Sequence, residues 1–388
     1  MDAKKLNKVD LIFDKEGYNA IEVLDKTLER SPDDIINDMI DSGLKGRGGA
    51  GFPTGLKWKF TRAEDDPVKY VICNADEGEP GTFKDREILD KVPGKVFTGM
   101  AIAAHAIGAK KGFIYVRAEY QFMRKSLQKQ LDEFNQILKD KGYDFHIELR
   151  WGSGAYICGE ESALFESMEG KRGEPRNKPP YPTKSGYLNK PTVINNVETL
   201  VYATIIYRIG PAEFKKLGTS DSRGSKVFSV SGDTPIAGIY ELEMGLPVNE
   251  FVDEFGDGDT KAVQIGGASG FCVPSKNFDN HIIGFEGIPT GGSMMLFNST
   301  RSMYNVLHNY LAFFTEESCG NCTPCRVGCQ QLLKGIEAVK GGKKSPSYLD
   351  DLKSLAKTMR ISSKCGLGQS VANSFISITD NFKEEIIY

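Results

Sequence analysis

Several classes of protein are excluded by what this sequence has little of. Only eight of its 388 residues are cysteine, a density far below that of small secreted proteins stabilised by disulfides. Neither sign of charge is in excess, since 49 basic residues face 52 acidic ones, and this balance gives no support for binding to nucleic acid or to an acidic membrane. The four histidines are scattered and lack the spacing of metal ligands.

Long hydrophobic runs are also missing. The longest weakly polar run, Thr98 to Ala109, is too short to cross a bilayer. The stretch from Met1 to Asp10 is charged and has no apolar core, which argues against a secretory signal. Three isolated cysteines, Cys73, Cys158 and Cys272, suit a reducing compartment. We therefore expect a cytoplasmic protein, either free or peripheral to a membrane complex.

Common catalytic motifs are absent from a chain that is long enough for several domains. The sequence contains no Walker A motif, no HExxH and no GxSxG. Its length predicts two or three domains with a large core. Hydrophobic residues make up 40% and charged residues 26%, which is ordinary for a soluble globular protein.

The cysteines that are present gather near the carboxyl end. Cys319, Cys322 and Cys325 are each separated by two residues. Three thiolates at this spacing can turn toward one small object, which is the geometry that a [4Fe-4S] cluster requires. Zinc is the main alternative, but structural zinc sites usually bring two separated cysteine pairs instead of a triplet.

The fourth ligand of such a cluster is ambiguous from spacing. Cys329 would complete the C-x2-C-x2-C-x3-C run of bacterial ferredoxins, but Gln330 stands where proline is usual. If a helix begins near Pro324, Cys329 lies one turn from Cys325 and fits a buried neighbour equally well. Cys365, forty residues further on, is the competing ligand.

Glycine is concentrated in a second stretch. Residues 43–58 contain six glycines, and three of them fit G-x-G-x-x-G. The dinucleotide-binding fingerprint needs a strand before it and a helix after it, whereas a helix precedes this run and Phe52-Pro53 follows it, so we reject that fingerprint. We favour a loop that cradles a phosphate or a flavin over a flexible surface loop, with Arg47 and Lys57 supplying positive charge.

The first half of the chain alternates between predicted helices and strands. Helices are expected over 18–29, 32–40, 96–108 and 162–168, with an amphipathic helix ending near residue 139, and strands over 68–73, 112–116 and 145–150. The alternation predicts a doubly wound α/β layer. Residues 74–81 form an acidic turn where the first strand ends. Ligands collect at such strand ends, although composition alone fits a solvated turn as well.

The pattern of predicted secondary structure changes twice after this α/β layer. Short strands with glycine turns, at 226–231, 238–241 and 262–265, predict a small β-rich domain that ends near residue 300. From Arg301 the pattern is that of a helical bundle carrying the cysteines. We therefore divide the chain into domains 1–225, 226–300 and 301–388.

Six motifs occur in order across nearly the whole chain: GRGGAGFPTGLKW, CNADEGEPG, GAYICGEES, NNVETL, SCGNCTPCR and CGLGQ. Together they closely resemble the NADH-binding, FMN-carrying flavoprotein subunit of respiratory complex I and its relatives in soluble hydrogenases and formate dehydrogenases. The resemblance implies an α/β fold with a Rossmann-like FMN domain, a β-grasp domain of the soluble-ligand-binding type and a carboxy-terminal helical domain that holds one [4Fe-4S] cluster.

The resemblance also implies a set of binding residues. Those expected to hold the flavin are Gly46, Arg47, Gly48, Lys57, Asn74, Asp76, Tyr156, Gly159, Glu160, Asn195 and Asn196. Those expected around the nicotinamide dinucleotide are Phe52, Phe60 and Tyr181 as flanking rings, with Lys178, Glu79 and Glu161 as polar contacts. The cluster ligands that the resemblance favours are Cys319, Cys322, Cys325 and Cys365.

The implied function is that of an NADH dehydrogenase, or diaphorase, subunit. Hydride would pass from NADH to FMN, and single electrons would then pass to the cluster and to partner subunits, for which we expect a thioredoxin-like [2Fe-2S] subunit and a further oxidoreductase. Acidic residues near the ribose would repel a 2'-phosphate, which favours NADH over NADPH. The alternative is a catalytically silent iron-sulfur scaffold that docks other subunits.

Overall fold

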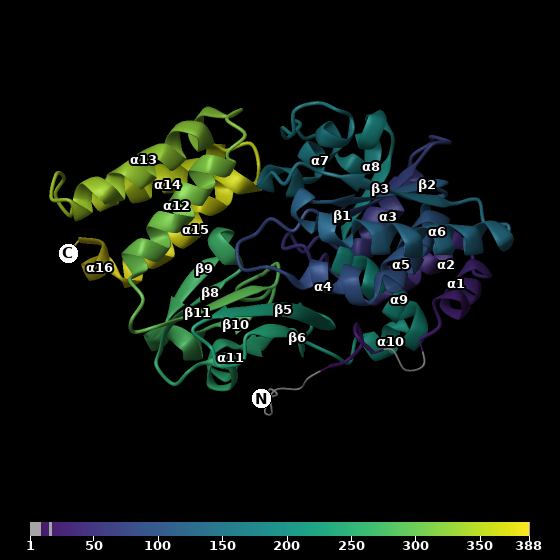
Figure 1. Cartoon of the computed structure of the whole chain (residues 1–388), viewed down its shortest axis with the longest axis horizontal. Helices are drawn as coiled ribbons and strands as arrows, with labels where there is room; N and C mark the ends of the chain where they lie inside the picture. Colours follow the sequence, from purple (N-terminus) through teal and green to yellow (C-terminus); the bar gives the residue numbers. More distant parts are fainter. Residues whose placement is uncertain (1–8, 15–17, 388) are drawn as a thin grey trace.

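The computed structural model describes residues 9–14 and 18–387. Most of the charged stretch from Met1 to Asp10 lies outside the described residues. Figure 1 shows an α/β region, a green β-rich region and a yellow-green helical region packed side by side. Among the described helices, none is both long and apolar enough to cross a membrane. The division into domains at residues 225 and 300 stays a prediction.

A parallel sheet organises the α/β region. Its described strands, in the spatial order β3-β2-β1-β4, are β3 (His146–Trp151), β2 (Lys111–Val116), β1 (Tyr70–Ala75) and β4 (Thr192–Asn196). The chain moves outward from β1 to β3 and then returns to the other side of β1. The direction of winding therefore reverses between β1 and β4, and ligands in open α/β sheets bind at the carboxyl ends of the strands that flank such a reversal.

Helices cover both faces of this sheet. One face packs against α5 (Pro93–Ile107), which contacts α1 (Ala20–Leu28), α2 (Pro32–Asp41), α3 (Thr54–Ala63), α6 (Arg124–Asp140) and α9 (Val197–Ile209). The predicted doubly wound layer is therefore confirmed. α5 and α9 approach closely because Gly99 has no side chain, since a Cβ there would lie 2.1 Å from the carbonyl oxygen of Leu200.

Alternate residues of the strands enter two different cores. Val71 and Cys73 belong to the core beneath α5, whereas Ile72 belongs to the core on the opposite face. This second core contains residues of α7 (Glu161–Met168) and continues without interruption into the carboxy-terminal helices. The sheet and the helical region therefore share one hydrophobic core. The remaining helices of the α/β region are α4 (Lys84–Lys91), α8 (Pro182–Ser185) and α10 (Pro211–Phe214).

The β-rich region contains a mixed sheet and one helix of two turns. In the spatial order β6-β5-β11-β8-β9 its strands are β6 (Gly238–Glu243), β5 (Ser225–Gly232), β11 (Ser293–Asn298), β8 (Thr260–Ile265) and β9 (Phe271–Pro274). β5 and β11 are parallel and the other neighbours are antiparallel. The helix is α11 (Val248–Phe255), and a short pair, β7 (Leu246–Pro247) and β10 (Ile282–Ile283), completes this β-grasp region.

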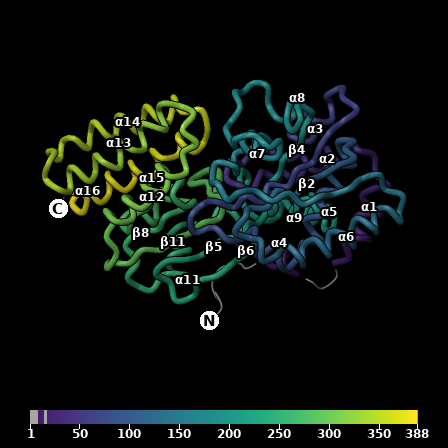
Figure 2. The backbone as a smooth tube through the Cα atoms, turned by 45° about the horizontal axis from the view of Figure 1, so that its top comes forward, coloured from purple at the N-terminus to yellow at the C-terminus, as the bar shows by residue number. Residues whose placement is uncertain are grey.

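The carboxy-terminal region is the helical bundle that the sequence predicts. Its helices are α12 (Met303–Glu317), α13 (Thr323–Lys340), α14 (Tyr348–Ser362), α15 (Gly366–Asn381) and α16 (Lys383–Ile387). The tube in Figure 2 shows this bundle at one end of the molecule, with the carboxyl terminus at its outer tip. The cysteine triplet spans the α12–α13 connection and the start of α13, and Cys365 lies in the α14–α15 connection.

Candidate functional site

A cleft of about 470 Å³ opens where β1 and β4 end. Asn74 of β1 and Asn196 of β4 are paired in register, so both side chains reach the same side of the sheet and both line the cleft. The Asn74 amide donates to the carbonyl oxygen of Gly159 at 2.9 Å. The cleft therefore lies at the winding reversal, where the fold favours a ligand.

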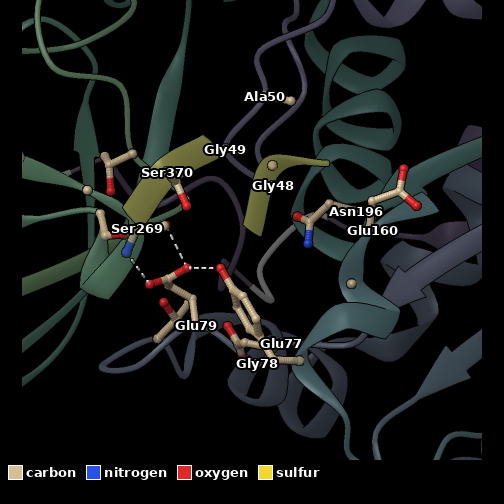
Figure 3. Close-up of a pocket in the computed structure, with 18 of the residues that line it drawn as sticks. Gly48, Gly49, Ala50, Glu77, Gly78, Glu79, Glu160, Asn196, Ser269 and Ser370 are labelled. Atoms are coloured by element: carbon tan, nitrogen blue, oxygen red, sulfur yellow. Dashed lines mark hydrogen bonds between the residues drawn. The ribbon is translucent and has the colours of Figure 1, made fainter. Parts of the chain in front are cut away.

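The glycine-rich loop between α2 and α3 forms one wall. Gly48 and Gly49 line the cleft (Figure 3). A Cβ on Gly48 would lie 3.2 Å from the Cβ of Asn196, so a larger residue would crowd the cleft at this point. The loop is closed by a hydrogen bond of 2.9 Å from the Gly46 amide to the Phe52 carbonyl oxygen.

The side chain of Asn196 is held by three neighbours. Its Nδ2 donates to the Asp85 carboxylate at 2.6 Å, and its Oδ1 accepts from the Lys84 ammonium at 3.2 Å. The same oxygen accepts from the backbone N–H of Glu198 at 3.0 Å and caps α9. Asn196 is thus preorganised before any ligand binds.

Two acids on the cleft wall have strongly shifted pKa values. Burial raises the pKa of Asp76 to about 7, and its Oδ2 has no hydrogen-bond partner within the described part of the protein. Burial also raises the pKa of Glu77 to about 7, and the neighbouring Asp85 adds to this effect. A buried polar atom without a partner is costly, so Asp76 indicates that a ligand donor belongs beside it.

Glu79 joins three regions of the molecule. Its carboxylate accepts from the Tyr156 hydroxyl at 2.7 Å and from the amide and hydroxyl of Ser269, at 3.0 and 2.7 Å (Figure 3). Ser269 belongs to the β-rich region, and its carbonyl oxygen accepts from Asn373 of α15 at 2.9 Å. Burial raises the pKa of Glu79. A nucleotide ribose that contacts Glu79, as predicted, would have to share the carboxylate with Tyr156 and Ser269.

The two predicted sources of positive charge, Arg47 and Lys57, contact backbone oxygens inside the protein. The Arg47 guanidinium is buried and donates to the carbonyl oxygens of Lys45 and Arg223. The Lys57 ammonium donates to the carbonyl oxygen of Ile194 at 2.8 Å. Neither cation lines the cleft, because both are used to satisfy backbone oxygens inside the protein.

Asn195 is also engaged inside the protein. Adjacent residues of a strand face opposite sides of the sheet, so Asn195 points away from the cleft that Asn196 lines. Its Oδ1 accepts a hydrogen bond of 3.0 Å from the indole of Trp58, a fully buried residue of α3.

Of the residues expected around the nicotinamide dinucleotide, Glu79 lines the cleft and the other five lie outside its lining. Phe52, Phe60 and Tyr181 are 46%, 48% and 59% exposed, and such rings are available to a ligand that arrives from solvent. Lys178 donates to Glu160 at 2.8 Å and to Glu161 at 2.7 Å.

The structure brings together only part of the predicted set. The predicted residues that line the cleft are Gly48, Asn74, Asp76, Glu79, Tyr156, Gly159, Glu160 and Asn196. The predicted residues that do not line it are Gly46, Arg47, Phe52, Lys57, Phe60, Glu161, Lys178, Tyr181 and Asn195.

Sequence reasoning missed several lining residues. Lys84 and Asp85 follow directly after the acidic turn, and reading that motif a few residues further would have included them. Ser269 and Ser370 come from the β-rich and helical regions, and no local pattern connects them to the cleft.

A second, smaller pocket gathers the thiols. Its wall contains Cys319, Cys322, Cys325 and Cys365. Cys329 does not line this pocket: it is fully buried, and its sulfur lies 4.0 Å from that of Cys325. A hydrogen bond with the Cys329 thiol lowers the pKa of Cys325.

Two helices begin at this pocket. Cys322 is the residue before α13, and Cys365 is the residue before α15, so the positive ends of both helix dipoles point toward the thiols. Burial raises the pKa of Cys365 to about 11, while the amides of Leu367 and Gly368 act in the opposite direction. Such helix ends stabilise an anionic group.

The four thiols at this pocket are candidate metal ligands. Considering only described residues, no three His, Cys, Asp or Glu side chains converge closely enough to hold one metal ion. A zinc ion would need its thiolates about 2.3 Å from one point. Four cysteine thiols at one pocket supply the ligand number that a [4Fe-4S] cluster takes, and a structural zinc ion takes four as well.

The cleft and the thiol pocket share a wall. Ile157 and Leu367 line both of them. Leu367 lies in the first turn of α15, which also contributes Gly366 and Ser370 to the cleft. The two pockets are therefore separated by little more than one layer of apolar side chains.

Comparisons with known proteins give a consistent result. Residues 39–204 match the family described as the Nuo51 FMN-binding domain, and residues 305–388 match the NADH-ubiquinone oxidoreductase-F iron-sulfur binding region. The chain is 40% identical to the NADP-reducing hydrogenase subunit HndC of Solidesulfovibrio fructosivorans, covering 96% of this chain and 79% of that one. It is 36% identical to the mitochondrial NADH dehydrogenase (ubiquinone) flavoprotein 1 of Dictyostelium discoideum, covering 96% and 81%.

A longer relative and a solved structure agree with these matches. The NAD-reducing hydrogenase HoxS subunit alpha of Cupriavidus necator is 45% identical over 96% of this chain, and the chain covers 63% of its length. A crystal structure of an NAD+-reducing [NiFe]-hydrogenase in the H2-reduced state superposes with a TM-score of 0.91 at 42% identity. The match covers 96% of this chain and 64% of that one, so the chain spans somewhat less than two thirds of these hydrogenase chains.

Proposed function

The chain belongs to the family defined by the Nuo51 FMN-binding domain and the NADH-ubiquinone oxidoreductase-F iron-sulfur region, and from this we propose that it is an NADH dehydrogenase subunit of a larger redox complex. FMN and a [4Fe-4S] cluster are the cofactors of this family. When bound, they supply hydride acceptance from NADH and delivery of single electrons to an acceptor. The observation that carries the proposal is the wall of Ile157 and Leu367 that the cleft and the thiol pocket share.

The cleft residues would hold the flavin by complementary polarity and shape. The paired amides of Asn74 and Asn196 supply hydrogen bonds at the strand ends. Gly48 leaves room against Asn196, and Asp76 offers its unpartnered carboxyl oxygen to a ligand donor. These features support an FMN site on this chain's own geometry.

The exposed rings outside the cleft lining would receive the nicotinamide dinucleotide. Phe52, Phe60 and Tyr181 offer stacking surface. Glu161 is held by Lys178, and a carboxylate there can accept ribose hydroxyl hydrogens and repel a 2'-phosphate. We propose NADH as the substrate for this reason.

The thiol pocket would hold the cluster through Cys319, Cys322, Cys325 and Cys365. The helix ends of α13 and α15 favour its negative charge. Three of these thiols are only partly buried, so the pocket lies near the protein surface. Electrons would leave from here to a partner, for which we propose a thioredoxin-like [2Fe-2S] subunit or a further oxidoreductase.

The proposal is tested by the absorbance of the purified chain. We expect flavin bands that bleach when NADH is added under anaerobic conditions, together with about four iron atoms per chain, the content of one [4Fe-4S] cluster. NADPH should bleach the bands more slowly. A chain that binds no flavin, or whose flavin NADH does not reduce, would contradict the enzyme and favour a scaffold.

A further inference from the structure

The cleft is rich in acid and poor in base. Its charged lining residues are Asp76, Glu77, Glu79, Lys84, Asp85 and Glu160. Lys84 is therefore the one cationic side chain on the cleft wall among the described residues. Since the structure directs Arg47 and Lys57 elsewhere, an anionic group in the cleft has Lys84 as its nearest source of positive charge.

The position of Lys84 is fixed by two hydrogen bonds and one ion pair. Its side chain is 2% exposed, and its ammonium contacts Asp85 at 2.6 Å, Glu198 at 2.9 Å and the Oδ1 of Asn196 at 3.2 Å. All three neighbours belong to the protein, so they surround the ammonium before any ligand binds. Lys84 therefore acts through Asn196: it fixes the amide so that Nδ2 faces Asp85 and keeps a second hydrogen for a ligand.

Lys84 belongs to a buried cluster of ionisable groups. Lys226 contacts Glu198 at 3.0 Å and also donates to the carbonyl oxygen of Arg47, whose guanidinium is buried nearby. Three cations thus meet three carboxylates, Asp85, Glu198 and Glu77. Burial acts to lower the pKa of Lys84, but these three acids outweigh burial and raise it. Burial lowers the pKa of Lys226 to about 8, Glu198 opposes this, and the neighbouring cations Lys84 and Arg47 add to it.

These acids keep Lys84 ionised before any ligand binds. Its ammonium is therefore a fixed positive charge at this wall of the cleft. The acids on the rest of the wall repel anions, so the negative part of a ligand is directed toward Asn196 and Gly48. A flavin that carries a phosphate has such a part, and riboflavin does not.

We propose that Lys84 is a positioning residue by which the cleft selects a phosphorylated flavin over an unphosphorylated one, because it fixes the amide of Asn196 and supplies the positive charge of that wall. This inference rests on the proposed function, since it takes FMN as the occupant. It assigns to Lys84 a role that the sequence pattern had given to Arg47 and Lys57.

The test compares FMN and riboflavin binding to the deflavinated full chain, measured by quenching of flavin fluorescence. Lys84→Met should weaken FMN binding about tenfold or more, as expected when a charge-assisted contact is lost. Riboflavin binding should change by no more than about twofold. Lys84→Arg keeps the charge and should recover part of the preference for FMN. Lys91→Met, on the exposed side of the same helix, is the matched control and should preserve that preference.

The possible results distinguish the role of Lys84 from the proposed FMN site. If Lys84→Met weakens both flavins equally, or neither, the role of Lys84 is overturned while the FMN site stands. If the native chain binds neither flavin, the proposed function itself fails.

A second variant guards against a loss of folding. Replacing Lys84 alone leaves Asp85 and Glu198 with one cation fewer, which can prevent folding. The double variant Lys84→Met with Glu198→Gln removes one charge of each sign, and a glutamine can still accept from Lys226. It should show the same loss of preference for FMN, and an unchanged preference would overturn the proposal.

Discussion

At the scale of single residues, the two candidate fourth cysteines make opposite predictions. Cys365 lines the thiol pocket at the start of α15, whereas Cys329 is fully buried behind Cys325. We expect Cys365→Ala to lose cluster iron, because one corner of the site has no ligand. Cys329→Ala should retain the full iron content, because alanine fits where a small buried thiol was. Iron and sulfide analysis of both purified variants measures this, and a Cys329→Ala chain without iron would reverse the assignment.

The acid at Asp76 predicts how stability depends on pH. Burial raises its pKa from 3.8 to about 7, so the folded state holds a proton that the unfolded state releases. The free energy of unfolding that the protonated Asp76 carboxyl contributes is therefore fully present below about pH 4. This contribution is lost as the pH rises toward 7. Asn at this position mimics the protonated form of Asp76. At pH 8, Asp76→Asn should therefore raise the midpoint of thermal unfolding of the deflavinated chain, and the free energy of unfolding should rise by about 1 kcal/mol or more.

The control for this prediction is Asp90→Asn on an exposed position of α4. At pH 4 the native chain and Asp76→Asn should unfold at nearly the same temperature. Glu77 and Glu241 also have raised pKa values, so only the difference between the two chains reports on Asp76. A difference that is as large at pH 4 as at pH 8 would contradict the assignment.

Residue-scale patterns predicted which stretches form the cleft, but not the direction of each side chain. The glycine-rich loop and the acidic turn do line it. Arg47, Lys57 and Asn195 point elsewhere because distant groups engage them: the Arg223 carbonyl, the Ile194 carbonyl and the Trp58 indole. A local sequence pattern contains no information about these partners, which lie more than a hundred residues away along the chain.

At the scale of elements, most of the predicted helices and strands are present, and two near the site were missed. β4 is short and runs directly into α9, so the local sequence gives no separate signal for a strand. α3 follows Phe52-Pro53 and contains Gly55, and both features reduced the helical signal. Gly55 is required there because a Cβ would lie 2.6 Å from the backbone nitrogen of Ile40 in α2.

The segment 9–14 is held to the protein by two buried side chains. Lys95 of α5 donates to the carbonyl oxygens of Leu11, Ile12 and Asp14, at 3.1, 2.7 and 2.7 Å. Glu241 of β6 accepts from the amides of Leu11 and Ile12, at 3.0 and 2.9 Å. The segment thus connects the α/β region to the β-rich region through its backbone.

We expect Lys95→Met to destabilise the chain by about 2 kcal/mol or more, because three buried carbonyl oxygens lose their donor. The methionine fills a similar volume, so lost packing contributes little. Thermal unfolding measures the effect. Lys110→Met, which removes a highly exposed ion pair with Asp144, is the control and should have little effect. Equal midpoints for the two variants would refute the role of Lys95.

At the scale of the whole molecule, removal of the cluster should be felt in the flavin cleft. The thiols join the α12–α13 and α14–α15 connections, and the first turn of α15 lines both pockets. We expect a chelated, iron-free chain to retain FMN but to release it a few times faster, about threefold, as the wall loosens. Fluorescence of released FMN measures the rate. An unchanged rate would show that α15 keeps its position without the cluster.

The order of α/β, β-rich and helical regions followed from the sequence, because each has its own periodicity and turn chemistry. Their shared core did not. Ile72 and Ile194 of the sheet belong to one hydrophobic cluster with residues of α12 to α15. Such contacts depend on how the folded regions pack against one another, which a local sequence pattern does not contain. Only the structure reveals that Glu79, Ser269 and Asn373 form a chain of hydrogen bonds across all three regions.

The first turn of α15 lines both the cleft and the thiol pocket, so the helical region cannot be removed or exchanged without changing the cleft. A protein that ended at β11 would lack the residues of α15 that close one side of the cleft, and its sheet would expose the hydrophobic surface that the helices cover. Exchanging the helical region between relatives would therefore alter the flavin site as well as the cluster site.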